Sequence, residues 1–156
     1  MKFNNFVKAI GSEGFIYKDE EGGKWLCGLG CALKIPETTG SVCSSKEFAA
    51  PTWFNDIVFS DPDDMHPVKL EEAYLPDADS KTSEVRRVFA LDGKYRVNIS
   101  NKSFSLIEKR DFTQSVECEL PNRDDVMLGS TALMVVDSIS EPDEPNILGI
   151  IFNIAD

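Results

Sequence analysis

The sequence predicts a mainly β fold: an antiparallel β-sandwich or barrel-like body with one short N-terminal helix and one long acidic loop. Short apolar or alternating segments separated by turn residues recur along the chain, as they do in all-β domains. No strand–helix–strand alternation is present, which disfavours a parallel α/β sheet. The 156 residues, 42% hydrophobic and 28% charged, fit one domain over 1–156 with a sizeable core.

The N-terminal segment has the apolar spacing of a helix. The side chains at i, i+3, i+4 and i+7 are Phe3, Phe6, Val7 and Ile10. Gly11 follows, where a helix end accepts a positive φ angle, so we expect a helix over residues 2–10. Its apolar stripe must cover either the domain's own sheet or a neighbouring protein. These four residues are therefore candidate partner-binding residues.

The rest of the first part, 1–59, reads as strands. Residues 14–18 and 24–29 flank an acidic loop that contains two glycines, which indicates a β-hairpin. Residues 29–35 are expected to extend its second strand. Residues 52–59 are apolar and aromatic enough for a strand, with a short helix as the alternative.

An acidic, proline-rich arm follows at 60–84. It carries eight carboxylates against two lysines, and so holds −6 of the chain's net charge of −11. It also contains His66, the one histidine. Such a segment is expected to lie outside the core, so deletion of 61–83 should leave a folded body. The arm supplies four further candidate partner-binding residues: Glu71, Glu72, Asp77 and Asp79.

The last part, 85–156, reads as an antiparallel meander. Asp92-Gly93 between two alternating segments predicts a hairpin with a type I′ turn, with Val88 opposite Val97 and Ala90 opposite Tyr95. The chain then turns into a further segment at 103–109, and 112–120 alternates cleanly. The alternation directs Glu117 and Glu119 to water. The almost continuously apolar runs 131–137 and 147–154 predict central strands covered on both faces.

Charge and length exclude several function classes. A net charge of −11 and a pI near 4.5 disfavour direct nucleic-acid binding and docking on anionic membranes, but permit a basic protein partner. No apolar run approaches the roughly 20 residues of a membrane span, and the N-terminal residues are too polar for a signal peptide. A cytoplasmic location is expected, with a virion as the alternative.

Two side-chain groups could carry chemistry. Carboxylates and an imidazole gather at Asp61, Asp63, Asp64 and His66, which could bind Mn²⁺, Zn²⁺ or, through oxygens alone, Ca²⁺. Their spacing matches no metal motif, and a solvated loop is the favoured interpretation. The cysteines, Cys27, Cys31, Cys43 and Cys118, have no standard zinc spacing and are expected to be free thiols. A Cys–His pair stays open, but no cofactor and no enzyme activity are expected.

The leading hypothesis is a non-catalytic protein-interaction or assembly protein, for example an accessory or structural subunit of a larger, virus-like assembly. Its partner would be another protein or further copies of this chain. One alternative is a small acidic inhibitor that covers a basic protein surface as a nucleic-acid mimic. Another is a metal-dependent binder or enzyme that uses the Asp61–His66 cluster.

Overall fold

The computed structural model describes residues 1–37, 46–77, 79, 81, 83–141 and 143–154. Its helices are α1 (Phe3–Ile10), α2 (Thr52–Val58) and α3 (Asn101–Phe104), with 3-10 turns η1 (Gly11–Glu13) and η2 (Pro62–Asp64). The strands are β1 (Phe15–Lys18), β2 (Lys24–Gly28), β3 (Cys31–Lys34), β4 (Lys46–Ala49), β5 (His66–Pro67), β6 (Lys69–Tyr74), β7 (Arg86–Leu91), β8 (Lys94–Ser100), β9 (Phe112–Pro121), β10 (Met127–Val136) and β11 (Ile147–Phe152). The prediction of a mainly β fold is confirmed.

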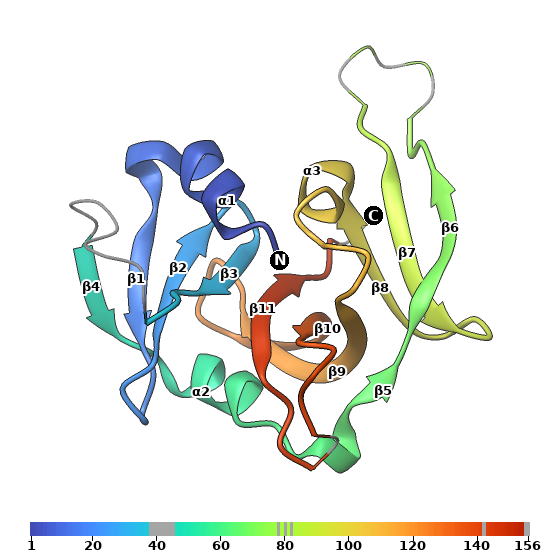
Figure 1. Cartoon of the computed structure of the whole chain (residues 1–156). Helices are drawn as coiled ribbons and strands as arrows, with labels where there is room; N and C mark the ends of the chain where they lie inside the picture. Colours follow the sequence, from blue (N-terminus) through green and yellow to red (C-terminus); the bar gives the residue numbers. More distant parts are fainter. Residues whose placement is uncertain (38–45, 78, 80, 82, 142, 155–156) are drawn as a thin grey trace.

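The strands form two sheets. The larger has the order β4-β1-β2-β3-β11-β10-β9-β5, and the smaller has the order β6-β7-β8. Neighbouring strands are antiparallel except β1 and β4, which pair in parallel. The β6–β7 hairpin extends beyond the rest of the body at the upper right of Figure 1. The body is thus sandwich-like, with one long central sheet.

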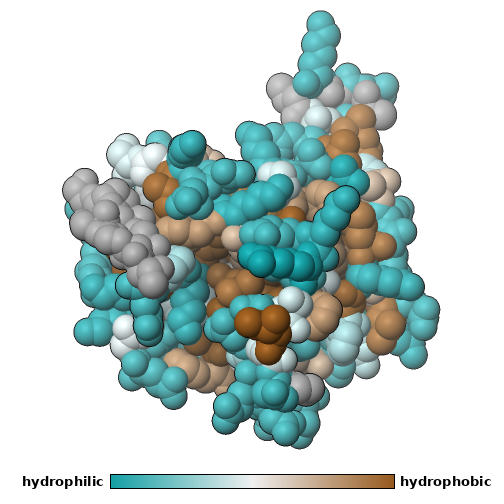
Figure 2. Space-filling view, in the orientation of Figure 1, coloured by the Kyte–Doolittle hydropathy of each residue, from teal (hydrophilic) through white to brown (hydrophobic). Residues whose placement is uncertain are grey.

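The central sheet carries a hydrophobic core on each face, and β10 separates them. Leu133 and Val135 point into the core that α1 and the smaller sheet cover, whereas Ala132 and Met134 point into the core under α2. All four are 0% exposed. The prediction that the two apolar runs form central strands is therefore confirmed. Hydrophilic residues cover most of the face in Figure 2, and apolar ones show through in separate patches.

The stripe on α1 packs on the chain's own core. Phe6 and Ile10 are 1% and 5% exposed, and Phe3 and Val7 are partly buried against the same cluster. Of the two alternatives for this stripe, coverage of the domain's own sheet is the one observed. Phe6 and Ile10 have no surface left for a partner, so their assignment as partner-binding residues is corrected.

One segment that the sequence assigned to a strand is helical, and a second is mostly turns. Residues 52–59 form α2, the alternative that the sequence left open, because Phe54, Ile57 and Val58 on one helical face are buried against the sheet. The segment 103–109 contains the end of α3 and turns, and Ser100 caps that helix by accepting from the Ser103 backbone N–H at 3.1 Å.

The hairpin at Asp92-Gly93 is confirmed, and its register differs from the prediction. Asp92 and Gly93 have φ angles of 50° and 77°, as a type I′ turn requires. The register then shifts by one residue, so that Phe89, not Val88, lies opposite Val97. Tyr95, at a φ angle of 58°, is the extra residue on β8. A bulge of this kind cannot be read from alternation alone.

The acidic arm is not one long loop. It contains η2, β5 and β6, so the prediction of a loop is wrong for these elements, although most of their residues are exposed as expected. Met65 and Val68 within it are each 7% exposed. Apolar residues at these two positions anchor the acidic segment to the body.

Residues 29–35 do not extend β2, because a tight turn at Leu29-Gly30 starts β3. Leu29 has a φ angle of 54°, and its side chain is 61% exposed.

A left-handed conformation costs a residue such as leucine about 1 kcal/mol, and asparagine tolerates it better. We therefore expect Leu29→Asn to raise the free energy of unfolding by about 1 kcal/mol in urea titrations. Leu91→Asn is the control, since Leu91 is 41% exposed without a positive φ. A loss of stability at position 29 would contradict the strain argument.

Candidate functional site

Two adjoining hollows lie between α2 and β9, and together we call them the α2–β9 groove. They share Asp56 and Glu117 and have volumes of about 550 and 680 Å³. The first hollow is largely apolar, with Trp53, Ile57, Cys118 and Met127 in its lining. The second is acidic, with Glu20, Asp61, Asp64 and His66 in its lining. A groove with an apolar end and an acidic end is thus present on one side of the central sheet.

The position of α2 builds one wall of this groove. Pro51 precedes the helix in an extended conformation, and the buried face of α2 fixes its rotation on the sheet. Asn55 ties the helix to the β1–β2 turn, because its Oδ1 accepts from the backbone N–H of Glu20 at 3.0 Å. Figure 1 shows α2 beside that turn. The opposite helical face then carries Trp53 and Asp56 into the groove.

Trp53 is held in place by neighbouring rings. Its ring makes edge contacts with Phe54 and Phe152 at centroid distances of 5.9 and 6.1 Å. Edge-to-face packing of this kind restricts the orientation of an aromatic side chain. The half-buried indole is therefore a preformed apolar surface, which loses little conformational freedom when a ligand covers it.

The electrostatics of the groove are one-sided. Six acidic residues line the two hollows: Glu20, Asp56, Asp61, Asp64, Glu117 and Glu119. Cys118 packs against the core under α2, so the alternating side chains of Glu117 and Glu119 lie on the other face of β9, at the rim of the groove. All six are exposed, and none of them forms an ion pair with any residue that the structure describes. The linings contain no lysine or arginine. The groove is therefore complementary to a positively charged ligand.

The residues of the proposed metal cluster are brought only partly together. Asp61, Asp64 and His66 line the second hollow, but Asp63 does not. The Asp61 carboxylate accepts from the Asp63 backbone N–H at 3.0 Å, and the His66 ring stacks on Tyr95 at 3.8 Å. Across the described residues, no group of three or more histidine, cysteine, aspartate or glutamate side chains could hold a metal ion. The cluster hypothesis is left without a coordination geometry.

The four candidate partner-binding residues of the arm differ in their surroundings. The Glu71 carboxylate accepts from the backbone N–H groups of Asp92 and Gly93 at 2.8 and 3.0 Å, and so closes the neighbouring turn. Glu72 lies 3.8 Å from Arg96 in an exposed ion pair. Asp77 and Asp79 are exposed and lie away from the groove linings. Glu71 and Glu72 already have partners within the chain.

Three of the cysteines are free thiols, and Cys43 lies outside the described residues. Burial raises the pKa of Cys27 to about 12 and the pKa values of Cys31 and Cys118 to about 11. The thiolate is the nucleophilic form, and these thiols stay protonated near neutral pH. A cysteine nucleophile paired with His66 is therefore unsupported at these three positions.

Sequence reasoning missed most of the groove. The sequence favours a strand for Trp53, Asp56 and Ile57, with a short helix as the alternative, and only the helical period over 52–59 places them correctly. The alternation of β9 did predict that Glu117 and Glu119 face water, and both are exposed. The residues of α2 and those of β9 meet because α2 packs beside β9, and the sequence carries no local signal for this packing.

Comparisons with known proteins gave no match. No family model fits the chain, and neither a curated protein nor a solved structure is significantly similar to it. In the described part of the chain, each helix is too short or too polar to cross a membrane. The functional argument therefore depends on the geometry and charge of the groove.

Proposed function

We propose that this chain is a non-catalytic protein-interaction protein that binds a basic segment of a partner protein in the α2–β9 groove. The observation that carries the proposal is the set of six exposed carboxylates without ion-pair partners among the described residues, beside an apolar surface at Trp53 and Met127. Apolar contacts supply affinity, while complementary charge speeds encounter and selects the partner.

The chemistry of the groove favours a peptide over a metal ion or a nucleic acid. Its carboxylates are spread over two hollows rather than gathered around one point, which suits several lysine or arginine side chains. Phosphate groups would be repelled. Assembly into a larger, virus-like structure stays a prediction, and it would use the same groove if the basic segment belongs to another subunit.

The nucleic-acid mimic has less support. A mimic needs a regular row of free carboxylates at about phosphate spacing. In the acidic arm, Glu71 is used inside the chain, and Glu72 and Glu84 are paired with Arg96 and Lys102. Six acidic residues without ion pairs in the described structure instead line a groove, which suits an inserted segment.

Neutralising the groove should weaken binding of basic peptides. We expect the triple variant Asp61→Asn, Asp64→Asn, Glu117→Gln to raise the Kd about tenfold, because three rim charges each contribute about 0.5 kcal/mol. The probe is a set of peptides selected by phage display from a dodecapeptide library with lysine or arginine at alternate positions. Fluorescence anisotropy at low and high salt then measures the Kd.

A matched triple variant controls for net charge. Glu13→Gln, Glu37→Gln and Asp77→Asn neutralise three exposed carboxylates outside the groove linings. This control should change the Kd by no more than about twofold, since screening limits the reach of distant charges to about 10 Å. Equal effects of the two triple variants would show that net charge, and not the groove, attracts the peptides, and the proposal would fail.

A further inference from the structure

The outer edge of β9 pairs with no described residue where it borders the α2–β9 groove. β5 pairs with β9 only at Ser115 and Gln114. Beyond that point, β10 is the one strand partner that β9 has within the described ranges. Glu117 and Glu119 lie in this stretch and line the first hollow. The groove therefore has a strand edge as one of its walls.

The backbone groups of Glu117 and Glu119 point to the outer edge of β9, the edge that pairs with β5. The backbone N–H of Val68 donates to the carbonyl oxygen of Thr113 at 3.1 Å, so Thr113 faces the β5 side. Successive residues of a strand direct their N–H and C=O groups to alternate edges. No register shift interrupts β9 from Phe112 to Pro121. The residues that share the direction of Thr113 are thus Ser115, Glu117 and Glu119.

These backbone groups have no partner in the described part of the chain. Within the described ranges, no hydrogen bond links the N–H or C=O of Glu117 or Glu119 to a residue on the β5 side. Both residues are exposed. An open strand edge of this kind is a template for another strand.

We propose that the basic partner segment binds in the extended conformation, as a β-strand added to β9 at Glu117 and Glu119. This inference rests on the proposed function and specifies how the segment is held. The added strand occupies the position in the sheet that β5 leaves after Ser115. Its main chain forms hydrogen bonds with the two open residues, and these bonds are independent of its side chains.

The pleat of the sheet then sets the side-chain pattern of the segment. Cys118 and Leu120 pack against the core under α2, so Glu117 and Glu119 point to the opposite face. Every second side chain of the added strand lies on the α2 side, near Trp53 and Ile57. The others lie beside the two glutamates. The segment is therefore an alternation of apolar and basic residues.

A second copy of this chain is a poor occupant of the edge. Pairing two β9 edges would bring Glu117 and Glu119 of one chain against the same residues of the other. Like charges directly opposite one another destabilise a strand pair. The net charge of −11 adds a general repulsion between copies. The occupant that fits is a basic segment of a different protein.

The test separates main-chain pairing from charge. Glu119→Pro removes one N–H from the open edge, and proline is tolerated on an edge strand where the N–H faces away from the ladder. Glu119→Gln removes the same charge and keeps the N–H. With the phage-selected peptides as probes, we expect the proline variant to bind about fivefold to tenfold more weakly than the glutamine variant, the effect of one or two lost hydrogen bonds.

A peptide series gives a second readout that needs no folded variant. Each selected peptide is N-methylated at one residue at a time, and we expect every second N-methyl group across the bound stretch to weaken binding to the unaltered protein. Equal Kd values for the proline and glutamine variants, together with tolerance of every N-methyl group, would overturn strand addition and leave groove binding intact. Failure of the library to yield any peptide sensitive to the triple neutralisation would overturn the proposed function itself. If the proline variant does not fold, the N-methyl series decides.

Discussion

Deleting residues 61–83 is expected to abolish the cooperative unfolding transition of this chain. The deletion removes β5 and β6 and, with them, Met65 and Val68. Met65 packs in the core under α2, whereas Val68 packs in the core on the other face of the central sheet. The acidic segment therefore contributes a buried side chain to each core, which explains why its charge alone misled the sequence prediction.

The energetic loss is comparable to the whole stability of a folded domain. Burial of each of the two side chains contributes about 1.5–3 kcal/mol. Val68 is also held by two hydrogen bonds with Thr113, at 3.1 Å from its N–H and 2.7 Å to its carbonyl oxygen. The deletion further exposes the edge of β7, which pairs with β6 over Lys69–Tyr74. Since folded domains are stable by about 5–15 kcal/mol in total, we expect no native state to remain.

Circular dichroism during heating, together with dye binding to exposed apolar surface, measures this outcome. The control replaces only residues 76–83 with a short Gly-Ser linker, which keeps β5, β6, Met65 and Val68. Loop changes cost little because closure entropy rises slowly with length, so this variant should melt cooperatively. A cooperative melt of the 61–83 deletion, close to that of the intact chain, would mean that the segment is a dispensable arm after all.

The hairpin, the central strands and the acidic segment show where sequence reasoning succeeds and where it fails. The hairpin at Asp92-Gly93 and the central strands β10 and β11 were predictable, because turn chemistry and continuous apolar runs are local signals. Residues 60–84 contain eight carboxylates, and this charge led to the prediction that the whole segment lies outside the core. The two apolar residues Met65 and Val68, which are buried, are not visible in the overall composition of the segment. A reading at single-residue resolution is needed where a charged segment is anchored at a few points.

The candidate groove could be predicted only in fragments. The period-two alternation of β9 predicts that Glu117 and Glu119 face water. A helical period places Trp53 and Asp56 on one side of α2. Their meeting depends on tertiary packing between segments about 60 residues apart in the chain. The open edge of β9 is also invisible in the sequence, because it exists only where the two-residue β5 stops pairing.

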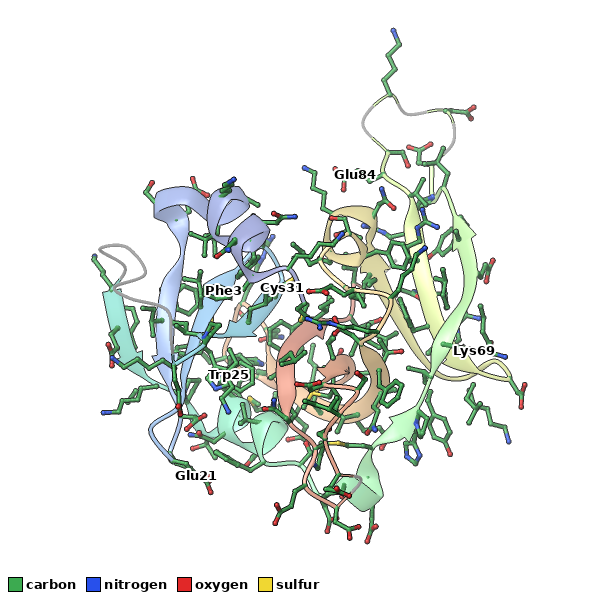
Figure 3. All side chains as sticks on the ribbon, in the orientation of Figure 1. Phe3, Glu21, Trp25, Cys31, Lys69 and Glu84 are labelled. Carbon is green, nitrogen blue, oxygen red and sulfur yellow. The ribbon has the colours of Figure 1, made fainter. Side chains whose placement is uncertain are left out.

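Asp19→Ala is expected to lower the free energy of unfolding by about 3 kcal/mol, a large effect for a single substitution. Asp19 is 6% exposed and lies in the turn between β1 and β2. One of its oxygens accepts from the backbone N–H groups of Glu21 and Gly23 at 2.9 and 2.8 Å. The other accepts from the indole N–H of Trp25 at 2.9 Å. Figure 3 shows Trp25 inside the body and Glu21 at its periphery.

The cost arises mainly at Trp25, because its side chain is 1% exposed and its N–H has no other acceptor in the described structure. A buried donor without a partner costs about 1–3 kcal/mol, and bonds to a charged acceptor are stronger than neutral ones. Asp19→Asn should cost less, about 1–2 kcal/mol, because its amide oxygen can still accept from the turn. Its NH₂ group would then face the indole N–H, donor against donor.

A double-mutant cycle in urea separates the indole bond from the turn bonds. Trp25→Phe removes the buried N–H, and we expect Asp19→Ala to cost about 1–2 kcal/mol less in that background than in the intact chain. Glu20→Gln, on the exposed neighbour of Asp19, should change stability by less than about 0.5 kcal/mol. If Asp19→Ala costs the same with tryptophan or phenylalanine at position 25, the carboxylate acts through the turn alone. A cost below about 0.5 kcal/mol in the intact chain would refute its role as the anchor of the first hairpin, on which the position of Glu20 beside α2 depends.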